Sequence, residues 1–246
     1  MKKAIIAIVT AAALIVCGTS LCGISYAKMG NDLSKLGFVE MEKDEVKIEQ
    51  EFQEVTIRSD IAAVTIQSTD QTYCSVECYQ DKKAPFDVRV ENGALVIDSK
   101  TREDLTWYER ASVFASTPKV IISLPKKDYG TLLAKMDTGN LKIEGPLTFE
   151  SMDLTMDTGD VHLSRTITSK ELHVKMDTGN FTFEDCDAGS VSAELDTGNI
   201  EGSFLSPKAI EAKSDTGSVH VPKQTEGGAC RLKTDTGNIR ITIAES

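Results

Sequence analysis

The sequence contains few aromatic and few basic residues. Only 6% of its 246 residues are aromatic, so small and β-branched side chains must fill much of any core. The 27 lysines and arginines are outnumbered by 38 acidic residues, which gives a net charge of −11. Binding to nucleic acid depends on a basic surface that neutralises phosphates, so this balance excludes nucleic acid as a partner. An acidic surface could instead attract cations.

Charged residues are also missing from residues 4–27, a stretch long enough to cross a bilayer as a helix. Two lysines precede it, as in an export signal. We expect residues 1–27 to form a single transmembrane helix that remains as an anchor. The alternative is a signal segment cleaved after Ala27, which would release a secreted protein. Both interpretations place the body on the extracytoplasmic side. Neither Cys17 nor Cys22 follows a small residue, so lipid attachment is disfavoured.

The body of the chain contains few cysteines. They are Cys74, Cys78, Cys186 and Cys230. Export permits disulfides but does not require them. If Cys74 and Cys78 share one strand, their Cα atoms lie about 13 Å apart, which is too far for a bridge. We therefore expect free thiols or buried small hydrophobic side chains.

A short motif, Asp-Thr-Gly, recurs throughout the second half of the chain. Its copies begin at Asp137, Asp157, Asp177, Asp196, Asp215 and Asp235, with spacings of 20, 20, 19, 19 and 20 residues. Apolar and polar residues alternate on both sides of each copy, as in Ala134 and Met136 before the first and Leu141 and Ile143 after it. Each repeat therefore predicts a strand, a corner and a second strand.

Two architectures accommodate such repeats. In a meander of hairpins, neighbouring corners have no reason to be identical. In a solenoid, each coil stacks on the last, and identical positions lie about 4.8 Å apart. We therefore predict an all-β fold, a β-solenoid resembling a parallel β-helix, whose six repeats rise roughly 29 Å. The expected organisation is an anchor or signal segment (1–27), a stalk (28–45), degenerate N-terminal coils that cap the solenoid (46–130) with an inserted loop (99–118), and regular repeats (131–246).

Each residue of the corner has a structural role. The aspartate can accept a backbone hydrogen bond in an Asx turn, and the threonine suits an extended backbone. The glycine supplies a restricted backbone conformation. The glycines are Gly139, Gly159, Gly179, Gly198, Gly217 and Gly237. The residue after each glycine is expected to stack as a polar ladder. This ladder comprises Asn140, Asp160, Asn180, Asn199, Ser218 and Asn238.

The column of aspartates carries an electrostatic cost. At the spacing of stacked coils, neighbouring carboxylates repel each other by about 1 kcal/mol per pair. The lysine-rich column two residues earlier and backbone N–H groups can offset this repulsion, and a bound calcium ion could do so too. No copy shows a known calcium-loop pattern, so we predict structural corners with no cofactor and no metal. Calcium binding is the alternative.

Two enzyme classes share features with the repeats. An aspartic protease uses the same triplet, but it needs two carboxylates that share a proton. Its triplet is typically followed by Ser or Ala, and only the copy at Asp215 is followed by serine. Some parallel β-helices cleave acidic polysaccharides, but the outward column here is more typical of a solvated face. That column holds His162, Thr182, Glu201, His220 and Arg240. We therefore predict no catalytic residues and no enzyme.

Three further segments have patterns that predict a turn, a loop and the end of the solenoid. Asn92-Gly93 is typical of a hairpin turn. Within residues 104–114, Trp107, Tyr108 and Phe114 form an aromatic cluster. A loop folded over the cap is favoured there, and a candidate partner patch is the alternative. Residues 239–243 are expected to end the solenoid, either blunted locally or docked against another copy.

The Asp-Thr-Gly-Asn/Asp-apolar repeats behind an N-terminal membrane segment resemble the bacterial putative-adhesin family of β-strand-repeat domains of unknown function. The resemblance covers residues 46–246 and is strongest over 131–243. It implies a bacterial, Gram-positive cell-envelope protein with a β-solenoid body, a link to envelope stress and no enzymatic activity. Together with the uncharged segment over residues 4–27, this predicts a single-pass protein of the cell membrane whose body lies at the cell surface. We therefore expect a non-catalytic, adhesin-like scaffold with an envelope protein or glycan as partner. The alternative is a calcium-binding or cell-wall-glycan-acting β-helix module.

Overall fold

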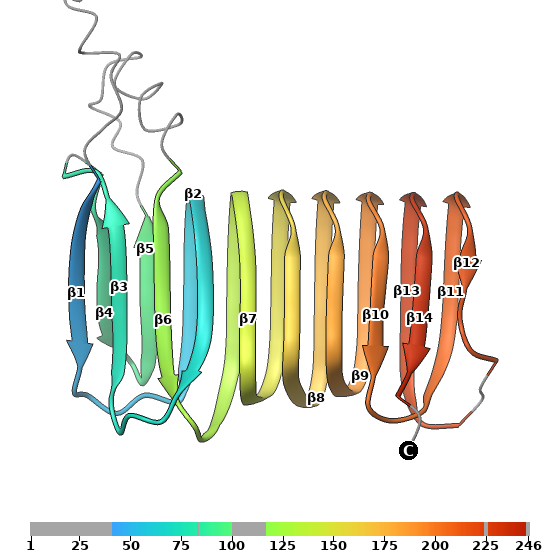
Figure 1. Cartoon of the computed structure of the whole chain (residues 1–246), viewed down its shortest axis with the longest axis horizontal. Coiled ribbons are helices and arrows are strands. Elements are labelled where there is room, and N and C mark those ends of the chain that lie inside the picture. Colours follow the sequence, from blue (N-terminus) through green and yellow to red (C-terminus); the bar gives the residue numbers. More distant parts are fainter. Residues whose placement is uncertain (1–40, 83, 100–116, 224–225, 245–246) are drawn as a thin grey trace, which may run out of the picture.

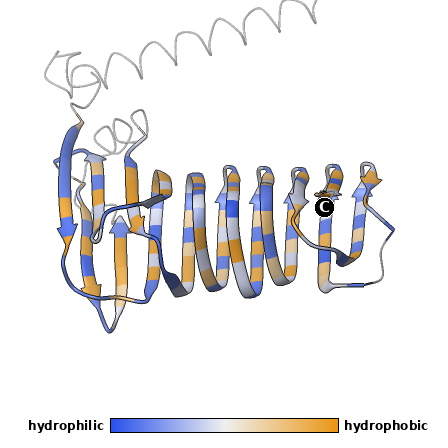
Figure 2. Ribbon diagram, turned by 60° about the horizontal axis from the view of Figure 1, so that its bottom comes forward, coloured by the Kyte–Doolittle hydropathy of each residue, from blue (hydrophilic) through white to orange (hydrophobic). Residues whose placement is uncertain are grey.

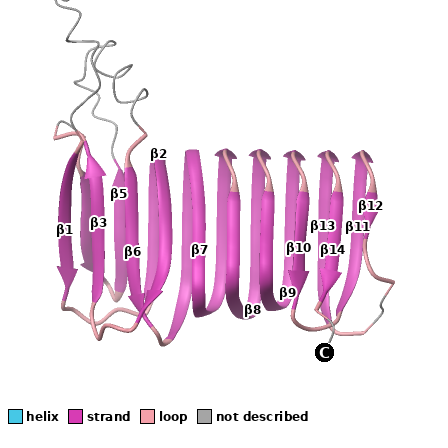
Figure 3. Ribbon diagram, in the orientation of Figure 1, coloured by secondary structure: helices cyan, strands magenta, loops and turns pink. Residues whose placement is uncertain are grey.

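The computed structural model describes residues 41–82, 84–99, 117–223 and 226–244. Every regular element in these ranges is a β-strand, and all belong to one 14-stranded sheet (Figure 3). In chain order the strands are β1 (Glu42–Ile48), β2 (Glu54–Thr69), β3 (Cys74–Gln80), β4 (Phe86–Glu91), β5 (Ala94–Ser99), β6 (Lys119–Pro125), β7 (Asp128–Thr158), β8 (Val161–Thr178), β9 (Phe181–Thr197), β10 (Ile200–Phe204), β11 (Lys208–Thr216), β12 (Val219–His220), β13 (Gly228–Thr236) and β14 (Ile239–Ile243).

The expected transmembrane helix lies outside the described residues. None of the regular elements in the ranges above is a helix that could span a bilayer. The predicted stalk extends too far, because β1 already begins at Glu42 and pairs with β3.

The strands wind into a solenoid whose coils lie side by side along one long axis (Figure 1). Neighbouring coils pair in parallel at an offset of one repeat. Leu141 of β7 is opposite Val161 of β8, which is opposite Phe181 of β9. Segments before each corner form one wall, and segments after it form a second wall. The prediction of an all-β, solenoid-like fold is confirmed.

The last two coils do not stack in chain order. We name each coil after the aspartate of its corner. Strand β13 of the Asp235 coil lies between β9 and β11, with Cys230 opposite both Val191 and Ile210. Strand β14 likewise lies between β10 and β12. The Asp235 coil is therefore inserted between the Asp196 and Asp215 coils. The expectation that each coil stacks on the preceding one is wrong here, and so is the expectation that residues 239–243 end the solenoid.

The side chains of these two coils give the physical reason. The Asp235 coil directs Leu232 and Ile239 into the core, whereas the Asp215 coil offers the smaller Ala212 and Val219 at the same positions. Placing the Asp235 coil inside buries the larger side chains, at 1% and 0% exposure. The coil with less apolar surface is left at the open end, where burial would contribute less to stability.

The N-terminal part contains one coil and a cap. Strand β2 spans both walls and pairs in parallel with β7, with Ala62 opposite Gly139. Strand β3 runs antiparallel to both β1 and β6, and β4 runs antiparallel to β5. The prediction of degenerate coils over 46–130 is correct for β2 and for β5 and β6, which both pair in parallel with β2, but it is wrong for β1, β3 and β4. For β4 and β5 the reason is the two-residue connection between them, which can join antiparallel neighbours but is too short for the crossover that parallel neighbours require.

The turn between β4 and β5 was predicted correctly. Strands β4 and β5 pair directly across Asn92 and Gly93, whose φ angles of 51° and 80° lie in the left-handed region. Asparagine and glycine are the residues that adopt this region most readily. The hairpin closes one side of the cap, because β5 also pairs in parallel with β2.

Inward-facing side chains fill the space between the two walls. Figure 2 shows the resulting alternation of apolar and polar residues along the strands. The ring centroid of Phe183 lies 5.2 Å from that of Phe181 and 4.6 Å from that of Phe204. These rings come from the adjacent strands β9 and β10. The few aromatic residues of the solenoid are thus used for core packing.

The four cysteines of the body are free and buried, as the analysis of their spacing predicted. Burial raises the pKa of Cys78 to about 11 and those of Cys74 and Cys230 to about 12. Burial also raises the pKa of Cys186. All four thiols therefore stay neutral in the folded chain under conditions in which the unfolded chain would ionise them.

This difference predicts a loss of stability at alkaline pH. Unfolded thiols ionise near pH 9.0, so their contribution is complete below that pH and is lost as pH rises toward the folded pKa values. We expect the free energy of unfolding to fall by roughly 1.4 kcal/mol per pH unit per thiol above pH 9. Urea denaturation between pH 8 and 11 measures the slope. The variant Cys230→Ala should show a shallower slope than the wild type, and identical slopes would contradict the prediction.

Candidate functional site

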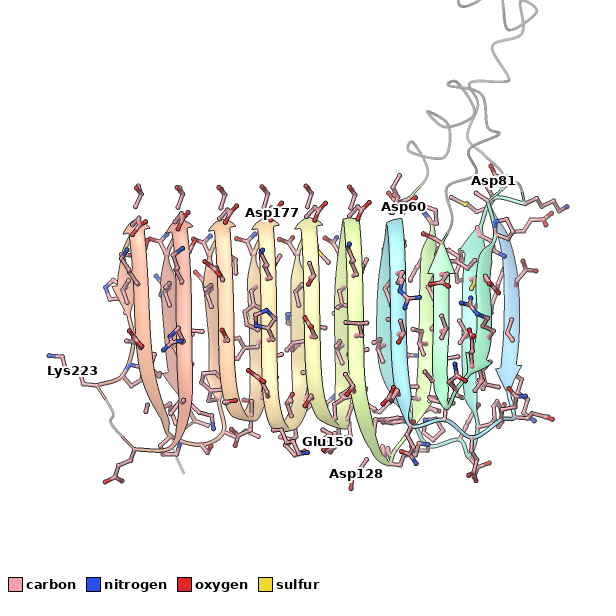
Figure 4. The ribbon with its side chains drawn as sticks, turned by 180° about the vertical axis from the view of Figure 1, so that it is seen from behind. Asp60, Asp81, Asp128, Glu150, Asp177 and Lys223 are labelled. Atoms are coloured by element: carbon pink, nitrogen blue, oxygen red, sulfur yellow. The ribbon has the colours of Figure 1, made fainter. Side chains whose placement is uncertain are left out.

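The Asp-Thr-Gly corners line up along one edge of the solenoid. Figure 4 shows Asp177 on this edge, with Asp128 and Glu150 on the opposite one. The corner glycines have φ angles between 136° and 153°. Their stacking order is Gly139, Gly159, Gly179, Gly198, Gly237 and Gly217. A Cβ atom on any of them would lie 1.5–1.9 Å from a carbonyl oxygen of the adjacent coil. The column therefore requires glycine both for its backbone conformation and for its close approach.

The residue after each glycine forms a second ladder. In each step a side-chain oxygen accepts a hydrogen bond from the backbone N–H of the same position in the next coil. The steps are Asn140 to Asp160 (2.9 Å), Asp160 to Asn180 (2.8 Å), Asn180 to Asn199 (3.1 Å), Asn199 to Asn238 (2.8 Å) and Asn238 to Ser218 (2.9 Å). The ladder follows the stacking order and not the chain order. It satisfies backbone donors that would otherwise be left without partners at the turn.

The corner aspartates point into solvent. The carboxylates of Asp215 and Asp235 lie 2.6 Å and 3.1 Å from Lys213 and Lys233 of their own strands. The hydrogen bond and charge of Lys213 lower the pKa of Asp215. Among the six corners, all of which the structure describes, no backbone N–H donates to the aspartate. The hydrogen bonds run instead to the residue after glycine, so the Asx turn does not form.

No metal-binding cluster is found in the described part of the chain, where no three His, Cys, Asp or Glu side chains converge. The corner carboxylates stand in a row and do not surround a common point. Calcium binding to this column therefore gains no support from the geometry, because calcium needs six to eight oxygen ligands.

The outward column on the second wall borders a shallow depression of about 470 Å³. Its floor is formed by small residues such as Thr182 and Gly202. Some of the lining groups bond within the wall, since His162 Nδ1 lies 2.9 Å from Thr182 Oγ1 and Thr242 donates to the Gly202 carbonyl at 3.3 Å. His220 belongs to the terminal Asp215 coil, several coils away from His162. The wall does not bring the two histidines together.

A second hollow of about 370 Å³ lies in the N-terminal cap. The ammonium group of Lys127 lies 5.1 Å from the ring centroid of Phe52 and 4.9 Å from that of Tyr129. It also donates to the Phe52 carbonyl at 2.6 Å. The aromatic walls that could receive a cationic ligand are therefore already occupied by a lysine of the same chain.

Sequence reasoning did not find a buried ion pair at the opposite edge. Lys208 is only 3% exposed and its ammonium group contacts the Asp187 carboxylate, while Ser206 Oγ lies 2.7 Å away. Burial alone would raise the pKa of Asp187, but the hydrogen bonds from Lys208 and Ser206 hold it below its usual value. The ion pair joins the start of β11 to β9, at the place where the chain passes over the inserted Asp235 coil. A lone lysine after Pro207 gave no signal of burial.

The aromatic cluster Trp107, Tyr108 and Phe114, the candidate partner patch, lies outside the described residues. The described part of the chain therefore offers the corner column, the two walls and the open end as its distinctive surfaces.

The chain is similar to several solved structures and to one protein family. A solved structure from Clostridium sporogenes, named a "putative cell adhesion protein", is 14% identical and aligns over 83% of this chain and 100% of its own, with a TM-score of 0.49. A "putative adhesin" from Bacteroides fragilis is 16% identical over 82% and 97%, also with a TM-score of 0.49. No curated protein matches the chain. The family described as Toastrack DUF4097 matches residues 52–246, and the chain belongs to that family.

Proposed function

We propose that this chain is a non-catalytic, adhesin-like scaffold of the bacterial cell envelope. The observation that carries the proposal is the uniformity of the corner column. Each corner contributes a glycine that stacks on its neighbour and a polar residue that joins the ladder. Apart from Asp160 and Ser218, which replace asparagine in the ladder, the corners are chemically alike, and such repetition is typical of a scaffold.

The electrostatics of the corners argue against acid–base catalysis. A carboxylate pair that shares one proton has one strongly raised pKa. The pKa of Asp215 is instead lowered by Lys213, and Asp235 is paired with Lys233. A carboxylate held in its charged form is poorly suited to donate a proton near neutral pH.

The walls supply the surface that such a scaffold would present. Their outward side chains repeat along the long axis at the spacing of the coils, about 4.8 Å. Many weak contacts along one extended ligand add up through effective concentration. An envelope glycan or an extended segment of an envelope protein is the kind of partner that this surface fits. Trp107, Tyr108 and Phe114 are the proposed anchor of that contact.

The location and the link to envelope stress belong to the same proposal. The uncharged stretch over 4–27, preceded by two lysines, supports a single-pass anchor with the solenoid on the extracytoplasmic side. A scaffold in that position could report contact with damaged envelope through residues 28–40 to the membrane.

Single Asp→Asn variants at all six corners test the scaffold against an active site. The full chain is used as bait with isolated envelope fractions, and retention is measured. We expect every variant to retain binding within about twofold and stability within about 0.5 kcal/mol, because the carboxylates are exposed. The variant Asp70→Asn, outside the column, serves as the control. Complete loss of binding or turnover in one or two corner variants would instead locate a site.

Deleting residues 104–114 tests the proposed anchor in the same assay. We expect the shortened chain to lose retention on envelope fractions while its thermal unfolding midpoint stays close to that of the wild type. Undiminished retention would remove the aromatic cluster from the proposal and leave the walls as the contact surface.

Thermal unfolding with calcium and with chelator tests the alternative function. Because the corner carboxylates do not converge, we expect the same unfolding midpoint in about 2 mM calcium and in chelator. A midpoint that rises with calcium in the wild type but not in Asp177→Asn would establish a cation site on the column and overturn this expectation.

A further inference from the structure

The two ends of the solenoid are finished differently. At the N-terminal end, β5 and β6 pair in parallel with β2, and β4, β3 and β1 add antiparallel strands outside them (Figure 1). At the other end, within the described ranges, β11 pairs with β13 and β12 pairs with β14, and neither has a partner on its outer side. This end therefore presents an open sheet edge, which proteins normally cover.

The core is also open at this end. Val219 is 39% exposed, and it is one of the three large hydrophobic residues that are exposed in the described part of the chain. Ala212 is partly buried, whereas Leu232 at the same position of the adjacent coil is only 1% exposed. A terminal repeat that shows its apolar side to solvent lacks the polar outer face of a capping repeat.

We propose that this edge pairs with the same edge of a second copy of the chain. Strand β11 would lie antiparallel to β11 of the second copy, across a twofold axis at Ala212. All residues from Lys208 to Thr216 are then paired. Glu211 lies opposite Lys213 of the second copy, and Lys213 lies opposite the second copy's Glu211. Opposite charges directly across an antiparallel pair are stabilising.

Other registers are less favourable. A twofold axis at Glu211 places Glu211 opposite its own copy, and an axis at Lys213 places Lys213 opposite its own copy and Glu211 opposite Asp215, so both registers bring like charges together. An axis at Ser214 restores an attractive pair but leaves only residues 212–216 paired. A register shifted by one residue would exchange the two faces of the second copy's β11 and would turn its Ala212 away from the shared core. The pattern of β11 therefore specifies one register, which also brings Val219 of each copy to the junction of the two cores.

The adjacent strand lacks this self-complementarity. In the equivalent register of β13, Arg231 would face Lys233 of the second copy, which is a repulsive pair. The charged residues of β11 are also free to change their ion-pair partners. Glu211 and Lys213 are 78% and 70% exposed in their present ion pairs with Arg231 and Asp215, and such exposed pairs contribute little.

A twofold contact has a further consequence for assembly. It uses the same surface on both copies and therefore closes after two molecules. The N-terminal caps lie at the far ends of the resulting rod. The inference goes beyond the proposed function, because the dimer forms through the edge whatever the walls bind.

Cross-linking of the full chain in membranes tests the register. In the variant Ala212→Cys the two introduced side chains have Cβ atoms about 5 Å apart, and a mild oxidant should join them. In Ala209→Cys the two copies of the residue lie six positions apart along the pair, about 20 Å, and should not react. The wild type gives the background from its own cysteines. A dimer in Ala212→Cys at least tenfold above both controls is expected. Equal yields in the two variants, or an adduct with a different protein, would overturn the proposal.

Charge reversals made in the Ala212→Cys variant distinguish a loss of pairing between copies from a loss of folding. Lys213→Glu places one glutamate opposite each Glu211, which creates two repulsive pairs, and should reduce the cross-linked dimer at least tenfold. Adding Glu211→Lys restores both attractive pairs and should restore the dimer. Both positions are exposed, so far-ultraviolet circular dichroism should be the same in all variants. Persistence of the dimer in the single variant, or failure of the double variant to restore it, would overturn the proposal.

Discussion

Replacement of Gly159 by alanine is expected to cost the solenoid at least about 4 kcal/mol of its free energy of unfolding. The new Cβ atom would lie 1.5 Å from the carbonyl oxygen of Gly139 and 2.7 Å from its carbonyl carbon. Both contacts are to backbone, so the methyl group fits only if two coils separate and their hydrogen bonds break. The φ angle of 137° adds a strain that alanine does not tolerate.

Gly93→Ala provides the matched control. Gly93 also has a positive φ angle, 80°, but a Cβ atom there meets nothing within 4 Å. We expect a cost of only about 1–2 kcal/mol, the conformational term alone. Urea denaturation of both variants measures the difference, which isolates the close approach of stacked coils. Equal costs would mean that the corner glycines serve the turn and not the stacking.

Much of the fold was accessible from the sequence, because a repeat leaves its period in every column. The alternation around Leu141, Val161 and Phe181 predicted strands on both sides of each corner, and these residues are paired in the structure. The order of the last coils was not accessible in the same way. Cys230 lies opposite both Val191 and Ile210 in the structure. Because equivalent positions carry similar residues in every coil, the sequence does not show which coils are adjacent.

The cap was less predictable for a related reason. Alternation of apolar and polar residues is the same in parallel and antiparallel strands, so Val76 and Val120 gave no sign that β3 and β6 run antiparallel. The turn at Asn92-Gly93 was predictable because its chemistry is local.

The corner was located correctly, but its residues divide the work differently from the prediction. Aspartate was expected to hold the turn, and in the structure Asn180 and its equivalents do so across coils. The difference follows from the glycine, whose extended positive-φ conformation leaves the aspartate facing solvent. Lys208 was missed because its burial depends on the passage over an inserted coil, which no local pattern encodes.

Truncation of one core residue in each of the last two coils is expected to reveal the stacking order. Ile239 and Val219 occupy the same position after their corners and are paired with each other, yet Ile239 is 0% exposed and Val219 is 39% exposed. Ile239→Ala leaves a cavity between two coils and should cost about 2–5 kcal/mol. Val219→Ala at the open end should change stability by about 0.5 kcal/mol or less.

Stacking in chain order makes the opposite prediction. The Asp235 coil would then form the end of the solenoid, so Ile239→Ala would be the mild change and Val219→Ala the severe one. Urea denaturation of the two variants therefore distinguishes the orders by the sign of their difference. The measurement must be made at a concentration at which wild-type chains are monomeric, because pairing through β11 would cover Val219 and raise its cost. A larger loss in Val219→Ala under those conditions would contradict the inserted coil, and with it the open edge on which pairing depends.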